Sequence, residues 1–227
     1  MLQERSAPFP DAAPSGFAAG VIIAVSAALT IVVLAHHPTT GHREPAAAIA
    51  DMVRLAATDR IVHGTMIAIM GALLFSFCVF SIRRNLRDQT VLAGLVAFAI
   101  GTVTLIGAAV LDGFVVPSIA TAYAGAPPSA LPAAVALLRF CGTTIQAASL
   151  LGIVAISLAI LLWSIGLLRS AGVRRTAGIV GVLAAAVPAV VFAVGGSTLT
   201  PHLLVAITAG QAVWYFVVAA LLVRGRV

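Results

Sequence analysis

The sequence predicts an all-α polytopic membrane protein, a six-transmembrane-helix bundle. Hydrophobic residues make up 61% of the 227 residues and charged residues only 9%, whereas soluble domains average about 45–50% and about 25%. A helix needs about 20 consecutive apolar residues to cross the hydrocarbon core of a bilayer. Six runs in the chain are long enough: 17–36, 61–82, 91–113, 140–168, 176–196 and 202–223.

The flanking segments complete the expected organisation. Residues 1–16 are rich in proline and small residues and predict a disordered tail. The first apolar run is longer than the usual 7–15 residues of a signal peptide, so we expect it to be retained as a span. Residues 17–223 then form one transmembrane domain, and residues 224–227 a short second tail.

Arginine positions predict the direction of the bundle. All 13 basic residues are arginines, with no lysine. If the N-terminus is cytoplasmic, three arginines fall in the outer segments, namely Arg43, Arg54 and Arg60, and Arg139 falls at the start of the fourth span. The other nine fall inside, at positions 5, 83, 84, 87, 169, 174, 175, 224 and 226. This asymmetry fits the positive-inside rule, so both termini should be cytoplasmic. No basic face is formed, so no nucleic acid is expected as a partner.

Two segments outside the spans have helical character. In residues 47–58 the apolar side chains fall roughly on one face, which predicts a short amphipathic helix lying on the outer membrane surface. Residues 127–138 predict a second helix of this kind or an outward extension of the fourth span.

Several polar residues share one depth in the predicted bundle. Counted at 1.5 Å per residue, His63 and His202 lie about 30–33 Å from the inner arginines, and Asp112 lies about 32 Å from Val91, where the third run starts, so all three fall near the outer edge of the hydrocarbon. His36 and Gln146 fall close to the same plane. Ionisable residues at membrane depth usually face a partner or a cavity. The sequence therefore predicts an outward-facing polar pocket.

The residue types in this layer allow several kinds of chemistry. Asp112, His63 and His202 are the candidate catalytic residues, and the same three could hold a metal ion. A haem b between His63 and His202 is an alternative, because haem b needs axial histidines on facing helices. A copper site with Met66 and Met70 is a further alternative. A metal-free acid/base site using Asp112 and a histidine also stays open.

A second group of residues predicts a binding role. Arg139, Thr143 and Gln146 have the i, i+4, i+7 spacing of one helix face and, with His36, are candidates for binding a small anion or a lipid headgroup. A purely structural ion pair between Asp112 and Arg139 would also explain the polar layer. We interpret His36, His37 and His42, beside Pro38, mainly as polar residues at the start of a loop.

One stretch resembles a known family. In "LLWSIGLLRSAGVRRTAGIVGVLAA" (161–185) a helix ends in an apolar Leu-Arg-Ser at 168–170, Arg174 and Arg175 form a basic turn, and the next helix opens with Gly178 and Gly181. This pattern resembles small bacterial six-span membrane proteins grouped as domain of unknown function 4386, over about a tenth of the chain. The resemblance implies the six-span layout, and we expect a multi-pass protein of the bacterial inner membrane. The resemblance supplies no catalytic residue.

Three functions follow from this reading. The leading hypothesis is a pocket that binds a ligand, metal or cofactor and acts on a substrate dissolved in the lipid bilayer. The second is a non-catalytic interaction or assembly subunit, with a membrane protein partner or a second copy of itself. The third is a small transporter, although no inverted repeat or broken-helix pair is evident in the sequence. The residues do not by themselves decide whether the protein is an enzyme.

Overall fold

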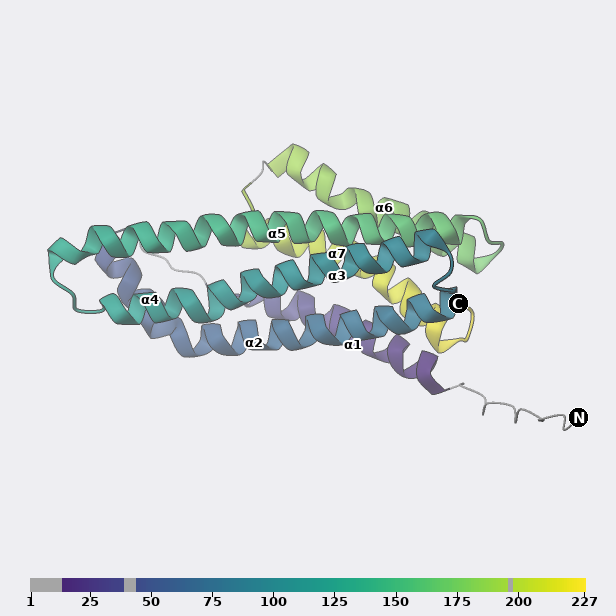
Figure 1. The fold of residues 1–227 in the computed structure, drawn as a ribbon, viewed down its shortest axis with the longest axis horizontal. Coiled ribbons are helices and arrows are strands. Elements are labelled where there is room, and N and C mark those ends of the chain that lie inside the picture. Colours follow the sequence, from purple (N-terminus) through teal and green to yellow (C-terminus); the bar gives the residue numbers. More distant parts are fainter. Residues whose placement is uncertain (1–13, 39–43, 196–197) are drawn as a thin grey trace, which may run out of the picture.

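The computed structural model describes residues 14–38, 44–195 and 198–227, which form helices joined by turns. The elements are α1 (Pro14–Ala35), α2 (Pro45–Arg84), α3 (Gln89–Val110), the π-helix η1 (Leu111–Val115), α4 (Val116–Tyr123), the 3₁₀ turn η2 (Pro128–Ala130), α5 (Leu131–Leu168), α6 (Val173–Gly195) and α7 (Pro201–Val223) (Figure 1). Within the described residues, six helical segments are long and apolar enough to cross a membrane. The predicted all-α, six-helix architecture is therefore confirmed.

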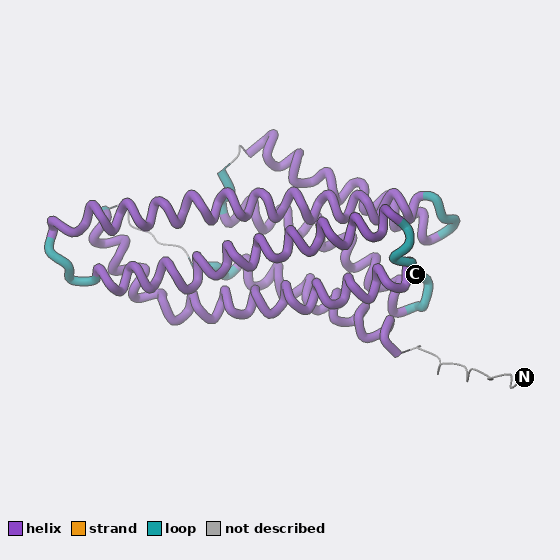
Figure 2. Tube along the Cα trace, in the orientation of Figure 1, coloured by secondary structure: helices purple, strands orange, loops and turns teal. Residues whose placement is uncertain are grey.

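The helices run roughly lengthwise in an elongated bundle (Figure 2). The α2–α3 turn, the α5–α6 turn and the C-terminus lie at one end, which we call the basic end (Figure 1). There the Arg174 guanidinium donates hydrogen bonds to the carbonyl oxygens of Arg226, at 2.7 Å, and Val227, at 3.2 Å. Arginines that are far apart in the sequence thus meet at this end.

Three helical segments project beyond the rest of the bundle at the opposite end. The first turns of α2, the whole of α4 and the first turns of α5 pack against one another there (Figure 1). Ile49 is buried against Ala120 and Ala134, with Met52 and Val53 beside them. These contacts give the apolar face of residues 47–58 a protein partner instead of the lipid surface.

The element boundaries differ from the expected ones for this reason. Residues 47–58 are not a separate surface helix but part of α2, which is continuous from Pro45 to Arg84. The third span continues through η1 and α4 to Tyr123 rather than ending at 113. Helix α5 begins at Leu131, so of the two expectations for residues 127–138 the outward extension of the fourth span is confirmed. Of the predicted tail, residues 14–16 belong to α1, and residues 1–13 lie outside the described residues.

A cluster of aromatic rings fills the core toward the basic end. Phe77 stacks on Trp163 and Trp214 with ring centroids 5.1 Å and 5.7 Å apart, and Phe98 and Tyr215 pack against the same ring. Offset aromatic contacts add to the free energy gained from burial alone. The cluster closes the bundle between the basic end and the site described next.

Candidate metal centre

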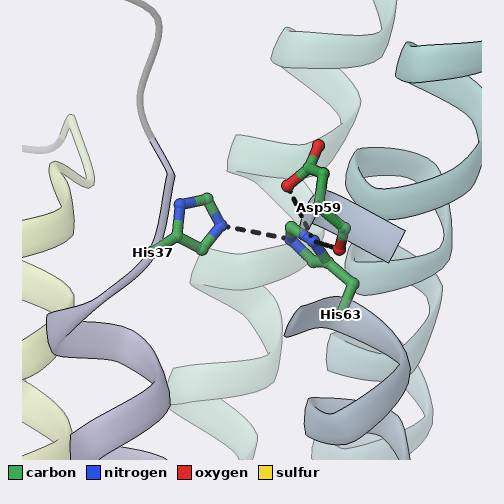
Figure 3. Close-up of side chains that lie close together, drawn as sticks. All are labelled: His37, Asp59 and His63. Atoms are coloured by element: carbon green, nitrogen blue, oxygen red, sulfur yellow. Dashed lines mark hydrogen bonds and ion pairs between the residues drawn. The ribbon is translucent and has the colours of Figure 1, made fainter. Parts of the chain in front are cut away.

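His63 is the most buried ionisable side chain of the site, with 2% of the residue exposed. Its ring atom Nδ1 lies 2.9 Å from the backbone oxygen of Asp59 and 3.1 Å from Oδ1 of the Asp59 carboxylate (Figure 3). Both partners are acceptors, so in the neutral ring Nδ1 carries the proton. The lone pair of His63 is then on Nε2, which points away from Asp59.

Asp112 reaches His63 from the neighbouring helix through an irregular turn. It lies in η1, the π-helical stretch that joins α3 to α4, and its Oδ2 is 3.2 Å from His63 Nε2. Pro117 follows this stretch and has no backbone N–H, and its ring crowds the carbonyl four residues earlier, at Gly113. Single π-turns inside helices are frequent at functional sites.

Gly113 allows the two helices to approach closely enough for this contact. A Cβ atom added at Gly113 would collide with Cβ of His63 and would lie 2.6 Å from its Cγ. Real Cβ atoms essentially never come that close to another heavy atom. A glycine at position 113 is therefore a condition for placing Asp112 beside His63.

His37 completes the group from the end of α1. Its Nδ1 lies 2.9 Å from the backbone oxygen of Pro38, which fixes the proton of the neutral ring on Nδ1 as in His63. Its Nε2 lies 3.2 Å from Nε2 of His63 and 3.7 Å from Oδ2 of Asp112. The two rings meet edge to face, with centroids 4.9 Å apart (Figure 3).

Three electron-pair donors therefore face one another. In their neutral forms His37 and His63 both present a lone pair on Nε2, and Asp112 adds a carboxylate oxygen, with separations of 3.2, 3.2 and 3.7 Å. Such a triangle is unfavourable unless a cation, either a proton or a metal ion, lies within it. Ligand atoms about 2.0–2.1 Å from a tetrahedral zinc ion are about 3.3 Å apart, which is close to the observed spacing.

The donor triangle lies between two cavities. The larger has a volume of about 300 Å³, is lined by His37, His63 and Asp112, and extends toward the basic end as far as Tyr215. The second, of about 270 Å³, is lined by His37, Asp59 and Asp112 and by residues of the projecting end, such as Met52 and Val116. The larger cavity thus adjoins all three donor residues, and the second adjoins His37 and Asp112.

The structure places the predicted site residues unequally. It brings His63 and Asp112 together, and Gln146 lines the larger cavity, where its side-chain amide is bonded to the backbone N–H and carbonyl of Leu199, both at 2.9 Å. His36 is exposed and its Nδ1 contacts Val32 oxygen at 2.8 Å. Met66 and Met70, considered as copper ligands, line the cavity beside His63.

Other predicted residues lie outside this group. His202, Arg139 and Thr143 are exposed and line neither cavity. Thr200 caps α7, but His202 in the first turn does not join His63 as the facing histidine that haem b would need. The ion pairs of Asp112 in the described chain go to His37 and His63 rather than to Arg139.

His37 and Asp59 were not among the predicted site residues. The sequence does carry a signal for Asp59, since it precedes His63 by four residues and so shares its helix face. The sequence indicates the start of a loop at His37, and this residue lies beyond the end of α1, where helical counting no longer applies. His42 lies outside the described residues.

No protein-family profile, curated protein or solved structure matches this chain. The residues themselves are therefore the basis for assigning a function.

Proposed function

We propose that the protein is an integral membrane metalloprotein. One divalent transition-metal ion of the zinc or iron(II) class is bound by Nε2 of His37, Nε2 of His63 and the carboxylate of Asp112. The single observation that carries the proposal is the donor triangle, whose sides of 3.2, 3.2 and 3.7 Å match the ligand spacing of a tetrahedral ion. Two histidines and one carboxylate are also the ligand set of non-haem iron(II) sites.

The partners of the two rings support a metal role. Metal-binding histidines almost always donate the second ring N–H to a carboxylate or a backbone carbonyl, which fixes the ring and its tautomer. His63 meets both kinds of acceptor in Asp59, and His37 meets the carbonyl of Pro38. Both rings are thus held with Nε2 free to bind a metal.

The number of ligands favours a reactive metal over a structural one. Structural zinc sites are closed by four protein ligands, whereas catalytic sites have three and leave one position for water or substrate. All three side chains line the larger cavity, and His37 and Asp112 also line the second one, so a fourth ligand would come from one of these spaces. A metal in this position lowers the pKa of a bound water or polarises a carbonyl oxygen.

The location of the protein is part of the same proposal. The six apolar helical segments imply contact with a lipid bilayer. Gathering of arginines at the basic end, together with the positive-inside rule, supports a cytoplasmic basic end and a metal near the outer surface. The resemblance over residues 161–185 supports the six-span layout, and the membrane that we propose is the bacterial inner membrane.

Elemental analysis of the detergent-purified protein tests the metal. We expect one zinc or iron per chain in the wild type, and its loss in His63→Ala and in Asp112→Asn. His202→Ala is the matched control, because this histidine is exposed and lines neither cavity. A wild type that stays metal-free after addition of zinc or iron(II) would contradict the proposal, and would leave a proton shared between His63 and Asp112 as the cation.

A further inference from the structure

We infer that the larger cavity binds a single-chain lipid, with a headgroup oxygen at the metal and the hydrocarbon chain directed toward Tyr215. The headgroup contact rests on the proposed metal, whereas the chain site stands on the cavity alone. The inference concerns the class of ligand that reaches the centre, and it commits to a lipid of the leaflet on the histidine side.

The lining of the cavity changes from polar to apolar along the bundle. At one end are His37, His63 and Asp112, and the wall beyond them is formed mainly by aliphatic side chains, among them Leu105, Ile153, Ile156 and Ile207, with the polar side chains of Thr208, Gln211 and Tyr215 toward the far end. Leu73 lies ten residues beyond His63 on α2 and also lines the cavity, which corresponds to about 15 Å of helix. The cavity is therefore long, with the donor atoms at one end and a mainly aliphatic wall beyond them.

The depth of the two parts matches a lipid of the surrounding bilayer. His63 lies 20 residues from Arg83 along α2, so the donor atoms are about 30 Å from the basic end, the thickness of the hydrocarbon core. A lipid in that leaflet has its headgroup at the level of the donors and its chain at the level of the aliphatic wall. Transfer of the chain from the bilayer into the cavity needs no dehydration, whereas a water-soluble polar ligand would lose its hydrogen bonds with water there.

The size of the cavity favours one chain. Its volume of about 300 Å³ is at the lower limit of the roughly 300–1,000 Å³ found for ligand pockets. At the inner end Tyr215 and the aromatic rings behind it close the space. Ala212, which is 1% exposed, forms part of the wall near this closed end.

Replacing either of two alanines of α7 by leucine distinguishes binding in the cavity from binding on the outer surface of the helix. Ala212→Leu adds side-chain volume to the cavity wall at a buried site, about 16 Å along α7 from Pro201 and far from the donor atoms. Ala220→Leu makes the same change at an exposed position of the same helix. Both variants should bind metal as the wild type does, because neither touches a ligand.

Photo-crosslinking tests the chain site in phosphatidylcholine nanodiscs that contain palmitate with a diazirine in its chain. Mass spectrometry should locate labels on cavity-lining residues of α5 and α7. Filling the cavity in Ala212→Leu should lower this labelling by about tenfold, with no change in Ala220→Leu. Labels confined to exposed residues, or equal in the two variants, would overturn the inference.

Competition and metal content address the headgroup. Unlabelled palmitate or palmitoyl-lysophosphatidate should displace the probe, the first indicating a carboxylate headgroup and the second a phosphate, and displacement by neither would overturn the inference. Cavity labelling should also weaken in His63→Ala. A wild type that holds metal but shows no cavity labelling refutes the lipid and leaves the metal proposal intact, whereas cavity labelling in a metal-free wild type refutes the metal and the headgroup contact.

Discussion

Nε2 of His37 and Nε2 of His63 lie 3.2 Å apart, although the opposite nitrogen of each ring already has an acceptor. These two atoms come from the loop that follows α1 and from helix α2, 26 positions apart in the sequence. Two lone pairs at this distance repel each other, so the arrangement requires a cation. The carboxylate oxygen Oδ2 of Asp112 lies 3.2 Å from His63 Nε2, and its negative charge increases the attraction for that cation.

Removing the charge of Asp59 should weaken metal binding without removing a ligand. Asp59→Asn places an amide where the carboxylate now meets His63 Nδ1 at 3.1 Å. Loss of such an outer partner typically lowers metal affinity by about 10–100-fold. Competition with a chelator, followed by zinc release, measures the change. Asp88→Asn, at the basic end, serves as the control, and equal affinities in the two variants would contradict a role for Asp59.

A methyl group at position 113 should separate the metal ligands. In Gly113→Ala the new Cβ collides with His63, so α2 and η1 must move apart and the contact between His63 and Asp112 must lengthen. We expect a loss of metal affinity of tenfold or more, on the scale of an ordinary overpacking cost of about 1–3 kcal/mol. Gly107→Ala is the matched control on α3, because a Cβ there meets nothing within 4 Å. Full metal occupancy in Gly113→Ala would contradict the argument.

The sequence predicts the depth of a residue in such a bundle better than its direction. Helical rise places His63, Asp112 and His202 near one plane, and the structure brings the first two together. His202 is exposed instead. The direction in which a residue points around its helix is set by tertiary packing, which a count of residues does not include. Six apolar runs and their basic end are predictable because hydropathy and charge act locally.

Two features of the site depend on contacts that no local pattern shows. The continuation of α2 outward to Pro45 depends on Ile49 packing against Ala120 and Ala134, which come from distant parts of the chain. The position of Asp112 depends on the π-turn of η1. In both cases long-range packing determines the outcome.

Gln146 should fix the backbone that leads into α7. Its side chain both donates to the carbonyl and accepts from the N–H of Leu199, at 2.9 Å each. In Gln146→Ala these two backbone groups lose their partner, and an unsatisfied buried group costs about 1–3 kcal/mol. Hydrogen exchange at the Leu199 amide should accelerate and the Tm should fall. Thr143→Ala, one turn away and exposed, should change neither the exchange rate nor the Tm. An unchanged exchange rate in Gln146→Ala would refute the proposed role of Gln146 in holding the Leu199 backbone.

Close packing of α6 on α5 and α7 should make Gly181 intolerant of a side chain. A Cβ at this position would collide with Oγ of Ser164 and would lie 2.5 Å from Nε1 of Trp214. We expect Gly181→Ala to destabilise the protein by about 1–3 kcal/mol. Gly142→Ala is the control, since a Cβ there meets nothing within 4 Å and alanine favours the helix. The Tm in detergent measures both, and a Gly181→Ala protein as stable as the control would contradict this packing.

Acidification should remove the stabilisation that Asp88 gives to the start of α3. The carboxylate accepts hydrogen bonds from the Thr90 hydroxyl at 2.6 Å and the Thr90 backbone N–H at 2.8 Å, and these bonds hold the pKa of Asp88 below its usual value of 3.8. Because the folded state has the lower pKa, the charged form stabilises the fold above the unfolded pKa, and this contribution disappears as the pH falls through the folded pKa.

The comparison of wild type with Asp88→Asn isolates this contribution, because asparagine still caps the helix but does not titrate. The Tm of the wild type should exceed that of the variant at neutral pH and approach it below about pH 4. Other carboxylates titrate in both proteins, so their effect cancels in the difference. A Tm difference that stays constant from neutral to acidic pH would show that the charge of Asp88 adds nothing to the cap.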